Sequence, residues 1–152
     1  MLQAGDKAPD FRGENQKGET ISLSDFKGKK VILYFYPKDD TPGCTAEACS
    51  LNDHNEYFLQ KGYVIIGVSP DSVNSHKQFE EKYRLSFHLV SDPEKRIIQE
   101  YGAWGEKKNY GKTSMGVLRS TFIISGEGLI EKVFSKVDTQ THAEQIIKEL
   151  GL

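Results

Sequence analysis

Cysteine is scarce in this chain, and that scarcity limits the chemistry its thiols can perform. Only Cys44 and Cys49 occur among 152 residues. Structural zinc and iron–sulfur clusters usually take four ligands, so one closely spaced pair cannot build such a centre alone. In a reducing compartment, a lone cysteine pair is more typical of catalytic, redox-sensing or metal-binding thiols than of a structural disulfide.

The chain also lacks long apolar runs and any large excess of one charge. Its longest apolar runs, at residues 31–36 and 63–68, are far too short to span a membrane. The net charge of −2 gives no electrostatic reason to expect a nucleic acid or an acidic membrane surface as a partner. Residues 1–6 show no basic region followed by an apolar stretch. We therefore expect an intracellular, cytoplasmic protein.

Length and composition are those of an ordinary globular protein. The chain is 37% hydrophobic and 28% charged, and its length suits one domain with a sizeable core. No internal repeat, low-complexity tract or linker interrupts the sequence. We therefore expect a single domain over residues 1–152.

Strand-like and helix-like segments alternate along most of the chain. Strands are expected at residues 20–23, 31–36, 63–68, 87–90, 121–124 and 129–134. Helices are expected at residues 45–60, from a cap at Asp71 or Ser72 to about Tyr83, at 94–101, and after a cap at Thr141. This order predicts an α/β fold with a central mixed β-sheet flanked by helices.

Cys44 lies where the apolar run 31–36 ends and a helical pattern begins. The free N–H groups of a first helical turn and the positive end of the helix dipole stabilise a thiolate, which is the reactive form of cysteine. Cys49 follows five residues later, near enough to form a disulfide once its partner is oxidised. Ligand sites in such folds favour the carboxyl ends of strands, where residues 37–44 are expected. The layout predicts thiol redox chemistry.

Three short segments surround the two cysteines, and these are Phe35-Tyr36-Pro37, Thr41-Pro42-Gly43-Cys44-Thr45 and Glu47-Ala48-Cys49. These motifs resemble those of the peroxiredoxins, specifically the bacterioferritin comigratory protein (peroxiredoxin Q) subfamily. Further matches are residues 5–11, 104–107 and 111–113, together with Arg119. The resemblance spans nearly the whole chain.

The resemblance implies a thioredoxin-like fold and a thiol peroxidase that reduces hydrogen peroxide and organic hydroperoxides to water and alcohols. Cys44 matches the peroxidatic cysteine, which becomes a sulfenic acid, and Cys49 matches the resolving cysteine of an intramolecular disulfide. Thioredoxin or a similar dithiol would recycle that disulfide. No cofactor or metal is implied, and we expect a monomer because an intramolecular disulfide needs no second chain.

Three further residues match groups that shape the peroxide site in this family. Arg119 can orient the peroxide and stabilise charge on the departing oxygen, because guanidinium is a permanent cation with fixed donors. The Thr41 hydroxyl can both accept from and donate to peroxide oxygens. Pro37 offers a stiff apolar wall without an N–H group.

The sequence also allows alternative interpretations of these residues and of the function. Cys49 could be an inert helix residue, and Arg119 without the resemblance would be a surface residue before a strand. A thioredoxin-like disulfide reductase normally carries Cys-x-x-Cys, which the Cys-x4-Cys spacing disfavours. A non-enzymatic redox sensor would react with one equivalent of peroxide and stop. The scattered residues His54, His76, His88 and His142 are expected to be surface or packing residues rather than metal ligands.

Overall fold

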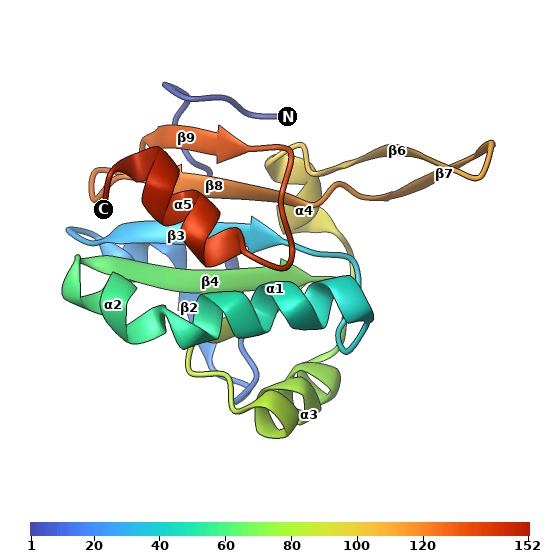
Figure 1. The fold of residues 1–152 in the computed structure, drawn as a ribbon, viewed down its shortest axis with the longest axis horizontal. Coiled ribbons are helices and arrows are strands. Elements are labelled where there is room, and N and C mark those ends of the chain that lie inside the picture. The colour runs from blue at the N-terminus through green and yellow to red at the C-terminus, as the bar shows by residue number, and fades with distance from the viewer.

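A seven-stranded mixed sheet lies at the centre of the computed structural model, which describes residues 1–152 apart from the side chain of Asn109 (Figure 1). Its strand order is β2-β1-β5-β4-β3-β8-β9. These strands are β1 (Arg12–Glu14), β2 (Thr20–Ser22), β3 (Lys30–Phe35), β4 (Tyr63–Ser69), β5 (His88–Ser91), β8 (Ser120–Ile124) and β9 (Ile130–Phe134). A separate hairpin of β6 (Trp104–Asn109) and β7 (Lys112–Val117) projects from the body of the molecule.

Helices cover both faces of this sheet. They are the 3₁₀ helix η1 (Leu23–Phe26) and the α-helices α1 (Pro42–Asp53), α2 (Asn55–Gln60), α3 (Val73–Tyr83), α4 (Arg96–Glu100) and α5 (His142–Leu150). Hydrophobic residues of α1, α2, α3 and α5 pack in one core cluster, whereas those of η1 and α4 pack in another. The predicted α/β arrangement, with a mixed sheet flanked by helices, is confirmed.

Strand β3 separates the two cores. Its residues Leu33 and Phe35 belong to one cluster, and Ile32 and Tyr34 belong to the other. Side chains alternate across a strand, so a continuously apolar run supplies both faces at once. Strand β3 runs parallel to β4 and antiparallel to β8, which makes its carboxyl end a meeting point for distant segments.

The helix expected at residues 45–60 is wrong in two respects. It begins earlier, because Thr41 is the N-cap and Pro42, which lacks an N–H group, takes the first helical position. It is also divided at His54 into α1 and α2. The His54 ring bonds the Ser50 carbonyl at 3.0 Å, and the His54 backbone N–H turns to Leu51 instead. The backbone hydrogen-bond pattern of the α-helix is therefore interrupted at His54.

Other sequence predictions hold with small shifts at the ends. The hairpin expected from strands 121–124 and 129–134 is present as β8 and β9. Ser72 caps α3 by accepting a hydrogen bond from the Ser75 N–H at 3.1 Å. Thr141 is the N-cap residue of α5, although its side chain makes no capping bond. The helix predicted at 94–101 is shorter, spanning only α4.

Strand β1 and the hairpin β6–β7 were not predicted. The residues of β7 are mostly exposed, and neither hairpin strand carries the apolar alternation that marks a half-buried strand. Trp104 is the first residue of β6. Among the described residues, no helix combines the length and the apolar character needed to cross a membrane.

Candidate active site

Cys44 lies in the first turn of α1, directly beyond the carboxyl end of β3. Thr41 caps the helix, and its carbonyl accepts the first helical bond from the Thr45 N–H at 2.8 Å. Cys44 is therefore the third residue of the helix, and only 1% of its surface is exposed. The positive end of the helix dipole acts on a sulfur in this position. Because the sulfur is buried, solvent and salt screen that interaction only weakly.

Arg119 also lies beside Cys44, although it comes from a distant part of the chain. It immediately precedes β8, whose first residue, Ser120, pairs with Phe35 at the end of β3. The Arg119 Nη2 atom donates to the Cys44 Sγ atom at 3.3 Å. The structure thus brings these two predicted site residues together.

Glu47 is a member of this site that the sequence reasoning did not assign. Its Oε1 atom accepts from Arg119 Nη1 at 2.7 Å, and its side chain is fully buried. Burial raises the pKa of Glu47 to about 7, and the neighbouring Arg119 charge opposes that rise. Glu47 follows Cys44 by three positions, so both face the same side of α1. The sequence offered one signal for this role, which is a glutamate that stands between two alanines in the helix that carries both cysteines.

The second carboxylate oxygen of Glu47 faces His142. Among the described residues, Glu47 Oε2 has no hydrogen-bond partner, and His142 Nε2 lies 3.7 Å from it. The His142 ring instead bonds Thr121 Oγ1 at 2.7 Å and Gln145 Oε1 at 2.9 Å. Burial lowers the pKa of His142 to about 4. His142 is therefore neutral at pH 7 and packs beneath the Arg119–Glu47 ion pair.

Thr41 and Pro37 flank the entrance to α1, and both are half-buried. The Thr41 hydroxyl donates to the Lys38 carbonyl at 2.8 Å. Its proton is thus committed inside the loop, and its lone pairs remain available to accept from a ligand. Pro37 follows β3 and Tyr36 directly.

Cys49 is half-buried further along α1, and both cysteines are free thiols. Burial, followed in size by the charge of Asp53, raises the pKa of the Cys49 thiol. Cys49 is consequently a protonated, weak nucleophile while the helix is intact.

Comparisons with known proteins identify the family of this chain. Residues 4–133 match the AhpC/TSA family model. The chain belongs to the AhpC/TSA family. It is 47% identical to peroxiredoxin Bcp of Bacillus subtilis over 98% of this chain and 95% of the relative. It is 41% identical to peroxiredoxin Bcp of Escherichia coli over 98% of this chain and 96% of the relative.

Solved structures place the chain more narrowly within the family. A structure of the Xanthomonas campestris bacterioferritin comigratory protein, studied for its alkyl peroxide reduction, matches with a TM-score of 0.89. The two chains are 36% identical, and the match covers 97% of each. The chain is a peroxiredoxin of the bacterioferritin comigratory protein (peroxiredoxin Q) subfamily, with the thioredoxin-like fold of that family. It is a thiol peroxidase, which takes a peroxide as substrate and needs a thiol reductant.

Proposed function

We propose that Cys44 is the residue that attacks the peroxide and that Arg119 is its principal catalytic partner. The observation that carries this proposal is the 3.3 Å contact between Arg119 Nη2 and Cys44 Sγ at the N-terminus of α1. The guanidinium has donors to spare, because only one nitrogen is engaged by Glu47. It can hold the thiolate and still bind a peroxide oxygen.

The proposed reaction breaks one O–O bond and forms one S–O bond. The Cys44 thiolate attacks the terminal oxygen of ROOH, the sulfur acquires that OH group as a sulfenic acid, and RO⁻ departs. The departing RO⁻ takes a proton and becomes water or an alcohol. Arg119 faces this oxygen and stabilises the charge that develops on it.

Thr41 and Pro37 complete the peroxide site in this proposal. The Thr41 hydroxyl, whose proton is held by the Lys38 carbonyl, accepts a hydrogen bond from the O–H of the peroxide. Pro37 forms an apolar wall beside it. The substrates would be hydrogen peroxide and organic hydroperoxides.

Cys49 is proposed as the resolving cysteine. Its thiolate attacks the Cys44 sulfenic sulfur, hydroxide leaves and is protonated to water, and an intramolecular disulfide forms. Thioredoxin or a similar dithiol then exchanges with that disulfide and restores both thiols. Because this cycle requires a thiol reductant and only one chain, we place the protein in the cytoplasm as a single-domain monomer.

The test is a steady-state assay with hydrogen peroxide or tert-butyl hydroperoxide, thioredoxin, thioredoxin reductase and NADPH. Many turnovers are expected for the wild-type chain and none for Cys44→Ser, because serine cannot supply the nucleophile. Consumption of a single equivalent would support a redox sensor instead. Peroxidase activity retained by Cys44→Ser would refute the assignment of Cys44.

A further inference from the structure

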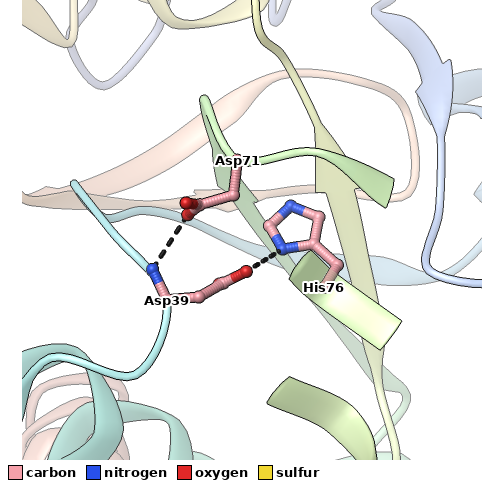
Figure 2. A group of neighbouring side chains, drawn as sticks. All are labelled: Asp39, Asp71 and His76. Atoms are coloured by element: carbon pink, nitrogen blue, oxygen red, sulfur yellow. Dashed lines mark hydrogen bonds and ion pairs between the residues drawn. The ribbon is translucent and has the colours of Figure 1, made fainter. Parts of the chain in front are cut away.

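The loop that leads into the active site is held by a buried polar network on its far side. Asp39 lies in this loop, two residues before Thr41 and five before Cys44, and its side chain is almost fully buried. Figure 2 shows its carboxylate directed at His76 of α3 and its backbone N–H directed at Asp71. The network therefore joins the active-site loop to the segment that follows β4.

Every polar atom of the Asp39 side chain has a donor. Its Oδ1 accepts from the Tyr36 hydroxyl at 2.6 Å, and its Oδ2 accepts from the Ser75 hydroxyl at 2.8 Å and from His76 Nδ1 at 2.7 Å. The Asp39 N–H donates to Asp71 Oδ2 at 2.8 Å. A buried carboxylate with three donors is well satisfied and has little freedom to move.

Both ring nitrogens of His76 face oxygen atoms of the protein. Nδ1 lies 2.7 Å from the Asp39 carboxylate, and Nε2 lies 3.1 Å from the Val90 carbonyl. The nearby Tyr36 hydroxyl donates to the other carboxylate oxygen of Asp39. Asp39 and His76 therefore form a directly bonded, buried pair.

Asp39, Asp71 and His76 lie close enough together to suggest a metal site. Each of them places one potential ligand atom within 4.8 Å of the others. Their hydrogen bonds argue against that role. A metal ligand must offer a lone pair to the ion, whereas each ring nitrogen of His76 already faces a protein oxygen. Both carboxylate oxygens of Asp39 are likewise already bonded to other protein side chains.

We propose that the buried Asp39–His76 pair is a positioning device for the peroxide reaction, fixing the loop that carries Pro37 and Thr41 relative to Cys44. This inference rests on the proposed roles of Cys44 and Thr41. The bridges of neighbouring Asp40, whose backbone is left-handed with φ of 56°, are exposed and hold the loop less firmly. Precise placement matters, since a misplacement of about 1 Å can cost about a hundredfold in rate.

Asp40 provides a matched control on the same loop. It joins the same helix, α3, through Lys82 at 2.8 Å and Tyr83 at 2.6 Å, but it is exposed. Exposed ion pairs contribute little, and asparagine tolerates a left-handed backbone well. Asp40→Asn should therefore leave the peroxide reaction nearly unchanged, whereas Asp39→Asn should not.

The experiment measures two reactions of Cys44 in a Cys49→Ser background, so that only one thiol reacts. Stopped-flow mixing gives the rate constant for hydrogen peroxide, and alkylation by iodoacetamide reports the exposure and ionisation of the same sulfur. Asp39→Asn and His76→Gln should each slow the peroxide reaction by roughly tenfold and leave alkylation within about twofold. The double variant should be no slower than either single variant, because the pair acts as a unit.

One addition keeps the test decisive. Ser75→Ala removes one peripheral donor to Asp39 and should give a smaller loss in the same direction, even if the other variants fold poorly. Wild-type peroxide rates in Asp39→Asn and His76→Gln, or equal losses in both reactions, would each overturn the proposal. Failure of the proposed function would appear separately, as peroxide reactivity in Cys44→Ser.

Discussion

Arg119 Nη2 lies 3.3 Å from Cys44 Sγ, although the two residues are 75 positions apart in the chain. The sheet produces this contact, because β8 runs antiparallel to β3 and begins where β3 ends. Glu47 holds the other side of the guanidinium at 2.7 Å. The active site is thus assembled from the N-terminus of one helix and the approach to one strand, and each group can be tested separately.

Replacement of Arg119 should slow the attack on peroxide without unfolding the protein. Loss of one preorganised donor at a reacting centre typically lowers a rate by about 10²–10³-fold, and we expect that range for Arg119→Met. Arg119→Lys should also be impaired, because an ammonium cannot contact Cys44 and Glu47 with a rigid fork. Stopped-flow oxidation by hydrogen peroxide measures the effect.

Arg96→Met is a suitable control for these variants. Arg96 is an arginine of α4, and its Nη2 atom donates to the Arg12 carbonyl at an exposed site. Wild-type speed in both Arg119 variants would remove Arg119 from the reaction. A loss of the same size in Arg96→Met would point to a general effect of arginine removal.

Cys49→Ser should separate the two halves of the catalytic cycle. Serine cannot attack the sulfenic sulfur, so Cys44 should be oxidised once and remain a sulfenic acid. Mass spectrometry with a dimedone trap should detect this species, and thioredoxin-dependent NADPH consumption should fall to background. Undiminished cycling with thioredoxin would show that Cys49 does not resolve the intermediate.

Glu47→Gln should change how stability depends on pH. Burial raises the pKa of Glu47 to about 7, above the 4.5 of an unburied glutamate. The folded state therefore binds a proton more tightly than the unfolded state does. The stability gained from that proton is present below pH 4.5 and is lost as the pH rises through 7.

Glutamine carries no such proton, so the variant should lack this component. The free energy of unfolding of the wild type, relative to Glu47→Gln, should fall between pH 5 and pH 7.5 by about 1.4 kcal/mol per unit at most. Urea unfolding at several pH values measures the difference. A constant difference would show that Glu47 is ionised throughout that range.

The sequence predicted the central sheet because its strongest signals are local. Residues 31–36 are apolar without interruption, and such a run has few alternatives to a buried strand. Thr41, Pro42 and Cys44 likewise carried enough local information to place a helix start near the thiol. The hairpin β6–β7 was missed for the same reason, since its exposed strands obtain their register from each other rather than from a core.

Long-range partners could not be read in this way. Glu47 and Asp39 look like ordinary surface acids in the sequence, and only the fold shows that each is buried against a basic side chain. The position of Arg119 was expected from a family resemblance, whereas its contact with Glu47 depends on how β8 meets α1. Pairing across 72 positions has no local signature.

Oxidation should unwind the first turns of α1, and the reason is geometric. Cys44 and Cys49 both lie within the helix Pro42–Asp53. Five positions on an ideal α-helix place their Cα atoms ~9 Å apart with side chains diverging by ~140°. A disulfide needs Cα atoms within about 7 Å and converging Cβ vectors. The intact helix therefore cannot contain the bond.

Unwinding must release Ala48 from the core, where Ala48 and Leu51 are both fully buried. The small alanine limits the cost of this step, and Leu51 marks where we expect the opening to stop. Amide hydrogen exchange on the reduced and disulfide forms should show protection lost over residues 44–51 on oxidation. The β4 amides provide an internal control, because that strand should stay protected in both forms. Equal protection of residues 44–51 in the two forms, or an oxidised structure with α1 intact, would refute this mechanism.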